Sequence, residues 1–243
     1  MAFRFMTPHR FSSIPRTHQF YLIAVILAGA WCVLLSMRDL NQGLIPNEWL
    51  ILAVLTVVSG SAPIRLYSIP VALSVSETFV FTSLILFGPA AGTLTVALDA
   101  AVISFWSFKR GQKLFKIVFN VCALPLTIWI AAQVLFAVGG FQPLFRNKQE
   151  SILLQRLLWP LLLCTVTYFL LSSWILTFAI SLERRVSPFS IWRNNFAWIS
   201  LNYIGGASVA ALIVTFTKQL DSTFILIIVT LLPVMALLYF TYS

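Results

Sequence analysis

Apolar runs recur along almost the whole chain and are separated by short polar or basic segments. Five of the runs are long enough to be membrane-spanning helices, since a span needs about 20 apolar residues. These five runs cover residues 19–37, 116–138, 153–180, 196–216 and 224–242. The pattern therefore predicts an all-α integral membrane protein.

Three further apolar runs, in the first half of the chain, are short and are interrupted by proline or glycine. They cover residues 49–62, 77–87 and 91–106. Interrupted segments are tolerated inside a membrane where neighbouring protein or a cavity satisfies their backbone groups, and in transporters they often mark a binding site. Counted with the other five, they predict about eight transmembrane helices. The pair around Gly88 and Pro89 also fits a re-entrant hairpin.

The 16 basic residues are distributed unevenly between the two sides that eight spans define. With the N-terminus in the cytoplasm, most of them fall on cytoplasmic segments, as the positive-inside rule requires. We therefore predict that both ends of the chain lie in the cytoplasm and that the protein crosses the cytoplasmic membrane several times. Residues 1–18 are expected to form a basic cytoplasmic segment, and residues 19–243 a single transmembrane domain.

Composition supports the membrane assignment and narrows the range of partners. Hydrophobic residues make up 60% of the chain and charged residues 9%, whereas about 25% of residues are charged in an ordinary soluble domain. The net charge of +9 is compatible with nucleic-acid binding, but in a membrane protein it more simply favours contact with anionic lipid headgroups. We therefore predict the lipid bilayer as a partner and no binding of nucleic acid.

The spacing of cysteine and histidine gives no sign of a metal or cofactor site. Cys32, Cys122 and Cys164 lie inside apolar runs, where free cysteine packs as a small hydrophobic residue. His9 and His18 do not have a spacing typical of zinc ligands. The chain also lacks a glycine-rich phosphate loop and a Gly-x-Ser-x-Gly nucleophile motif. We therefore predict no metal, no cofactor and no enzymatic activity.

A basic and aromatic segment at residues 181–195 fits a short helix at the inner membrane surface. Its sequence, SLERRVSPFSIWRNN, combines arginines with large apolar side chains, as helices that lie in the interface do. An ordinary cytoplasmic loop that follows the positive-inside rule is an equal alternative.

Two acidic residues in the interrupted central runs are the strongest candidates for a ligand site. Asp99 falls in the body of the run at residues 91–106, among small residues that let a helix or ligand approach closely. A carboxylate inside a bilayer costs at least about 2.5 kcal/mol, so such a residue is a functional candidate by default. Glu77 has a structural alternative, because Ser74 and Glu77 have the spacing of a helix capping box.

Two asparagines are candidates to complete the polar lining of this site. Asn120 lies one helical turn after Lys116, so the two are expected on the same helix face. Asn202 is followed by Tyr203 and two glycines, a composition that favours close helix packing. Hydrogen bonding between helices is the alternative role for both amides. The predicted ligand-binding residues are Glu77, Asp99, Asn120 and Asn202.

The stretch TFVFTSLILFGPAAG at residues 78–92, followed by Asp99 and by KLFKIVFN at residues 113–120, resembles a recurrent bacterial membrane module. It is similar to the multi-spanning, membrane-associated sensor regions that precede HD-GYP phosphodiesterase, GGDEF cyclase or histidine-kinase domains. The Phe-Gly-Pro sequence with a following small-residue helix is also similar to the substrate-binding S-components of energy-coupling-factor vitamin importers.

The first resemblance implies a membrane sensor that binds a small or apolar ligand and relays a helix movement to a cytoplasmic signalling output. The output domain is expected either after Ser243 or on a separate partner protein, and a homodimer is compatible with both arrangements. Pro233, in the last apolar run, is expected to kink the relaying helix. The second resemblance implies the substrate-binding component of a small-molecule transporter, which needs an ATPase partner.

Overall fold

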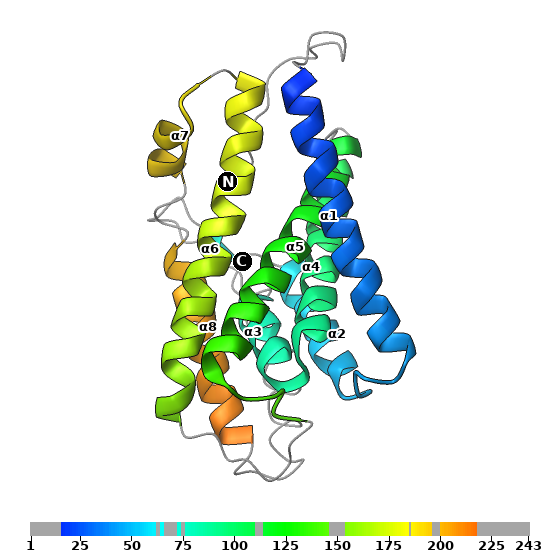
Figure 1. The fold of residues 1–243 in the computed structure, drawn as a ribbon, viewed down its shortest axis with the longest axis vertical. Helices are drawn as coiled ribbons and strands as arrows, with labels where there is room; N and C mark the ends of the chain where they lie inside the picture. The colour runs from blue at the N-terminus through cyan, green and yellow to red at the C-terminus, as the bar shows by residue number, and fades with distance from the viewer. Residues whose placement is uncertain are drawn as a thin grey trace.

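The computed structural model describes residues 16–61, 64–65, 72–73, 76–109, 114–145, 154–184, 186–195 and 200–217 (Figure 1). These residues form eight α-helices and one short antiparallel ladder. The helices are α1 (Arg16–Asn41), α2 (Trp49–Ser61), α3 (Ser76–Phe87), α4 (Pro89–Lys109), α5 (Leu114–Gly139), α6 (Leu154–Arg184), α7 (Pro188–Asn195) and α8 (Ser200–Thr217). The ladder pairs β1 (Ile64–Arg65) with β2 (Ala72–Leu73). The predicted all-α class is confirmed.

Three helices are long and apolar enough to cross a membrane. They are α1, α5 and α6, with candidate spans at Thr17–Asn41, Leu114–Gly139 and Gln155–Glu183. α1 and α5 have 26 residues each. At 1.5 Å per residue each is about 39 Å long, which exceeds the hydrocarbon thickness of about 30 Å. The prediction of a membrane protein is supported in this general form.

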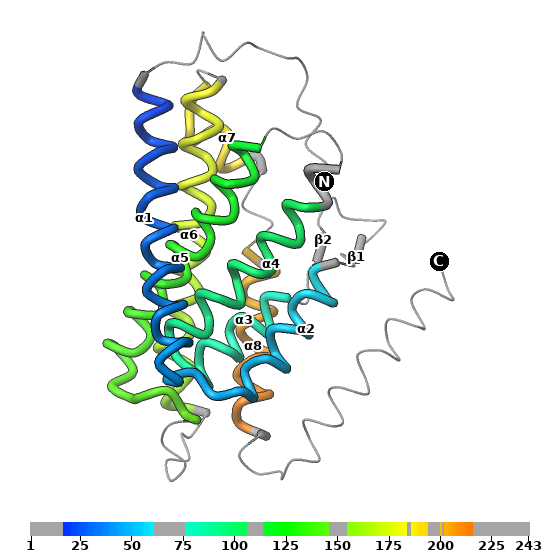
Figure 2. The backbone as a smooth tube through the Cα atoms, turned by 90° about the vertical axis from the view of Figure 1, so that its right-hand side faces the viewer, coloured from blue at the N-terminus to red at the C-terminus, as the bar shows by residue number. Residues whose placement is uncertain are grey.

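α2 and α3 are shorter than the thickness of a membrane. They have 13 and 12 residues, so each is about 20 Å long or less. In Figure 2, α2 rises from the lower end of the molecule, α3 returns to that end, and α4 rises beside both. The structure therefore does not show eight complete crossings, because α2 and α3 are half-length helices.

The long helices and the short ones form one bundle. α1, α5 and α6 run side by side along its length (Figure 1). α5 packs against α1, α4 and α6, whereas α3 packs against α2, α4 and α8. The short helix α3 is thus enclosed by protein on several sides.

The enclosure of α3 explains how so short a helix is tolerated. Ser76 and every residue from 78 to 85 are buried, and the core around them includes Phe81, Leu84 and Ile85 at 0% exposure. A span that neighbouring helices surround needs no lipid-facing length of its own. α3 is therefore a buried central helix of the bundle.

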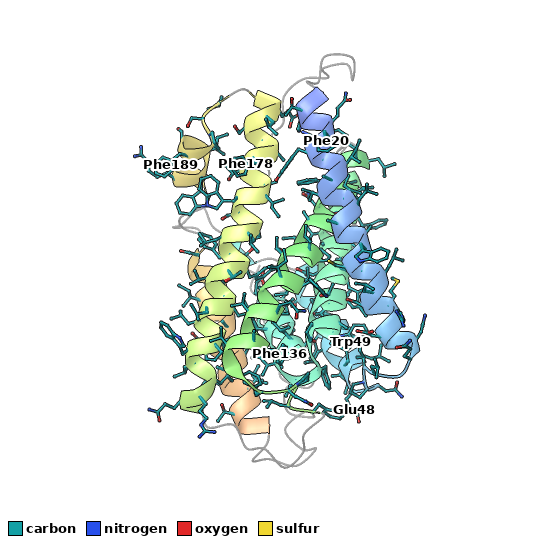
Figure 3. All side chains as sticks on the ribbon, viewed as in Figure 1. Phe20, Glu48, Trp49, Phe136, Phe178 and Phe189 are labelled. Atoms are coloured by element: carbon teal, nitrogen blue, oxygen red, sulfur yellow. The ribbon has the colours of Figure 1, made fainter. Side chains whose placement is uncertain are left out.

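Large apolar side chains also cover the outside of the molecule. On α1, Phe20, Leu27 and Trp31 are 76%, 65% and 64% exposed. The exposed Phe20 and Phe178 lie toward the upper end of the bundle, as Figure 3 shows. In a soluble protein an apolar surface of this extent would favour association, whereas in a membrane it contacts the lipid tails.

A tight turn joins α3 to α4. Gly88 has a φ of +99°, a left-handed conformation that glycine adopts without strain, and its N–H donates to the Leu84 carbonyl at 2.9 Å. Pro89 occupies the first helical position of α4, where its missing N–H costs nothing. Leu144 N–H donates to the Ile85 carbonyl at 3.2 Å. The turn therefore lies at the same end of the bundle as the segment after α5, as the predicted alternation requires.

The helix bounds agree well with the apolar runs of the sequence. The segment at residues 181–195 contains a helix, α7, which favours the interfacial-helix interpretation over a plain loop. Four earlier predictions lie outside the described residues. They concern the basic segment up to residue 15 with His9, the Ser74 cap, the run at residues 224–242 and the kink at Pro233.

Candidate functional site

Asp99 lies near the middle of α4, where α2 ends and α3 begins. Its side chain is only 8% exposed. The Ser76 hydroxyl, at the start of α3, donates to Asp99 Oδ2 at 3.1 Å. A Cβ atom on Gly60 of α2 would overlap Asp99 Oδ1. The second carboxylate oxygen is thus turned toward the end of α2, and only glycine leaves room for it.

Glu77 lies in the first turn of α3, beside α8. A Cβ atom on Gly206 would come within 2.9 Å of Glu77 Cβ, so α8 approaches α3 closely at this point. Glu77 Oε2 and Asp99 Oδ1 are both buried, and neither has a hydrogen-bond partner within the described part of the chain. Each carboxyl group therefore has one oxygen that receives no donor from the described residues.

Two tyrosines complete this polar region. Tyr168 of α6 and Tyr203 of α8 are 1% and 8% exposed, and both lie close enough to Glu77 and Asp99 to interact with them electrostatically. Their ring centroids are 5.0 Å apart, with the rings at 70°. We define the carboxylate cluster as Ser76, Glu77, Asp99, Tyr168 and Tyr203.

The ends of the two half-length helices give this cluster its electrostatic setting. The first N–H groups of a helix have no partner inside the helix and carry a partial positive charge, and the last carbonyls carry a partial negative charge. α3 begins at Ser76, next to both acids, and α2 ends beside Asp99. The start of α3 therefore favours negative charge in the cluster, and the end of α2 favours a proton or a cation.

A pocket lies beside the cluster, between α4, α5 and α6. Its volume is about 180 Å³ and most of its wall is apolar. It is lined by Ala100, Ile103, Ser104, Phe119, Asn120, Ala123, Leu124, Ser172, Ile175 and Leu176. Pockets with apolar walls and a few placed polar groups are typical of small-molecule sites.

The pocket and the carboxylate cluster share two structural elements. Ala100 lines the pocket and follows Asp99 directly on α4. Ser172 lines it from α6, and its hydroxyl lies 3.2 Å from the Tyr203 hydroxyl. A molecule in the pocket therefore contacts a residue that is hydrogen-bonded to the cluster.

The four predicted ligand residues occupy neighbouring places rather than one cavity. Glu77 and Asp99 belong to the carboxylate cluster, whereas Asn120 lines the pocket from α5. Asn202 lies in the first turn of α8, partly buried beside Tyr203, and does not line the pocket. Lys116, on the Asn120 side of α5, forms an ion pair with Glu183 at 2.9 Å. Ligand binding by these residues stays a prediction.

Sequence reasoning did not identify Tyr168 and Ser172 as site residues. Both lie in the longest apolar helix, α6, where nothing in the sequence distinguishes an inward tyrosine or serine from an outward one. Tyr203 was expected only in close helix packing, and its contact with α6 adds a hydrogen bond to that role. A polar residue that meets a suspected acid from another helix has no signature in one sequence.

Comparison of the chain with family models, with curated proteins and with solved structures gives no match. Within the described residues, no group of three or more His, Cys, Asp or Glu side chains is arranged to hold a metal ion. Cys32 and Cys164 are buried and Cys122 is partly buried, each as a free thiol. The site is therefore described by its own geometry alone.

Proposed function

We propose that the chain is a membrane-embedded sensor module that binds a small or apolar ligand in the pocket between α4, α5 and α6. The observation that carries the proposal is the position of Ser172. It lines the pocket and is hydrogen-bonded to Tyr203 of α8. A ligand that occupies the pocket competes for the Ser172 hydroxyl and thereby acts on α8.

The contact between α8 and α3 gives the signal a path. Gly206 of α8 packs directly on Glu77, so a displacement of α8 changes the surroundings of both acids. Tightly packed interfaces of this kind have discrete arrangements rather than a continuous range. A ligand shifts the balance between them by its difference in affinity. The receiver in this proposal is a cytoplasmic output domain or partner protein at the inner membrane.

The test is to fill the pocket by substitution. Ala123 lines it at 7% exposure, and a phenylalanine there occupies the space of a ligand. With a reporter cyclase fused after Ser243, Ala123→Phe should fix the output at one level. Ala137→Phe, on the exposed side of the same helix, is the matched control and should leave output unchanged.

Native mass spectrometry of the full chain supplies a second measurement. A molecule that copurifies with the wild type should be lost in Ala123→Phe and kept in Ala137→Phe. Equal reporter output and equal adducts in both variants would contradict a ligand site in this pocket.

A second candidate function is the substrate-binding component of a transporter. It is favoured by the half-length helices α2 and α3, which meet at Asp99, because discontinuous helices of this kind surround the sites of many transporters. Copurification of the chain with an ATPase complex, together with a reporter fusion indifferent to Ala123→Phe, would replace the sensor proposal with this one.

A further inference from the structure

We propose that Glu77 and Asp99 form a proton-binding site, in which the two carboxyl groups hold one proton between them. The proposal goes beyond ligand sensing, because it stands on the carboxylate cluster and not on the pocket. It starts from two buried oxygens, Glu77 Oε2 and Asp99 Oδ1, which have no donor within the described part of the chain.

Burial makes two ionised carboxylates at this place costly. Taking one charge out of water costs several kcal/mol even after relaxation of the protein, and two like charges that act on each other add repulsion. Ser76 supplies one hydrogen bond, to Asp99 Oδ2. The one ion pair among the described side chains, Lys116–Glu183, involves neither acid. A proton removes one charge and turns one carboxyl into a donor for the other.

The packing around the acids suits a proton better than a larger occupant. Gly60 leaves no space for a Cβ atom in front of Asp99 Oδ1, and Gly206 packs against the Cβ atom and backbone of Glu77. A metal ion needs several oxygen ligands at more than about 2 Å in a defined geometry. A proton needs only two oxygens within hydrogen-bond distance of each other.

Among the described residues, the other titratable groups that act on the pair are tyrosines. Tyr168 of α6 and Tyr203 of α8 interact with both acids, and Cys164 lies behind Tyr168. α2 contains no titratable residue, and among the described residues no group of α1 or α5 acts on Glu77 or Asp99. Both tyrosines are neutral donors at physiological pH, so they do not neutralise the pair.

Release of this proton is expected to follow movement of α8. Gly206 holds α8 against Glu77, and separation of α8 from α3 would admit water to Oε2. Hydration lowers the cost of the ionised form, so the proton leaves to water when the contact opens. The site therefore couples a helix movement to the uptake or release of one proton.

Infrared spectroscopy of the full chain in lipid nanodiscs tests the proposal directly. A protonated carboxyl group has a C=O stretching band that ionised carboxylates lack. The wild type should show such a band, equivalent to one carboxyl per chain, at neutral pH and lose it at alkaline pH. Asp99→Asn and Glu77→Gln should each abolish or shift the band, and Glu183→Gln should leave it unchanged.

Isotope labelling keeps the test valid if a variant fails to fold. In the wild type, carbon-13 labelling of all aspartates or of all glutamates should shift the band and assign it. Absence of the band at neutral pH would overturn the proposal and indicate neutralisation by a basic side chain. Loss of the band when sodium replaces choline at constant pH would overturn it in favour of a sodium ion.

Discussion

Asp99 shows at the scale of single residues how one buried acid constrains its neighbours. Ser76 donates to one of its oxygens, and Gly60 yields space to the other. Glu77 has a similar relation to Gly206. Glycines on two other helices thus allow close approach, Gly60 to the Asp99 carboxylate and Gly206 to the Cβ atom and backbone of Glu77.

The adjacent glycines of α8 give a matched pair of substitutions. Gly206→Ala would place a Cβ atom 2.9 Å from Glu77 Cβ, whereas Gly205→Ala meets nothing within 4 Å. Overpacking costs about 1–3 kcal/mol, but alanine in an open helical position is favourable by up to about 1 kcal/mol. We therefore expect Gly206→Ala to lower the melting temperature in detergent and Gly205→Ala to leave it unchanged or raise it.

The same two glycines also define a result that would contradict the geometry. Equal melting temperatures for Gly206→Ala and Gly205→Ala would mean that α8 does not approach α3 at Glu77. A response of Gly205→Ala alone would mean that α8 is rotated about its axis.

The two acids could be singled out from the sequence because a charge in an apolar run has a physical cost that composition makes visible. Their partner residues on α6 could not be identified from the sequence. Tyr168 and Ser172 are ordinary residues of an apolar helix, and only the rotation of α6 turns them toward α8. The two acids were expected together with Asn120 and Asn202, and the structure places Asn120 in the wall of the adjacent pocket and Asn202 beside Tyr203 in α8.

At the scale of helices, most boundaries followed from elementary signals. Pro89 and Gly88 separate α3 from α4, and the basic segment after α6 contains a separate helix, α7. The sequence predicted the length of α3 better than it predicted the place of α3 in the bundle. The run at residues 77–87 was counted as a span, but the enclosure of α3 depends on α2, α4 and α8, which pack around it.

α7 is held to α6 by aromatic contacts. The Trp192 indole N–H donates to the Ser173 hydroxyl at 2.9 Å, and its ring stacks on Trp174 with centroids 5.8 Å apart. Aromatic pairs add about 0.5–1.5 kcal/mol beyond the area that they bury. Trp192 is therefore the anchor of this short helix.

Removal of the anchor should loosen α7 without unfolding the bundle. In Trp192→Ala we expect faster amide hydrogen exchange across residues 188–195 and unchanged exchange in α5. Ser190→Ala, at an exposed position of the same helix, serves as control and should exchange like the wild type. Unchanged exchange of α7 in Trp192→Ala would show that the membrane surface, rather than α6, holds this helix.

At the scale of the whole molecule, the sequence predicted the order and direction of the helices but not their depth. The long helices α1, α5 and α6 are clear from apolar length alone. The half-length pair α2 and α3 reverses direction inside the bundle, and the number of complete crossings depends on that reversal. The length and hydropathy of α2 and α3 do not predict this reversal, because contacts with α4 and α8 stabilise it.

The direction of the helices gives a prediction about the two membrane faces. Glu48 and Trp49 lie at the lower end of the bundle (Figure 3), the end to which Pro143 also belongs because it packs against Gly88. The connection between α6 and α7 lies at the opposite end (Figure 1). From the excess of basic residues in the segments of that upper end, we predict that this end lies in the cytoplasm.

Cysteine labelling of intact cells measures this orientation, after replacement of the three native cysteines. An impermeant thiol reagent should modify cysteines placed at Asn47 and Gln142, which are exposed at the lower end, and should spare one at Ser187, exposed at the upper end. Permeabilised cells should label all three, which controls for reactivity. Labelling of Ser187→Cys alone would reverse the orientation. Labelling of Asn47→Cys without Gln142→Cys would show that the helices from α2 to α5 do not return the chain to the face where α1 ends.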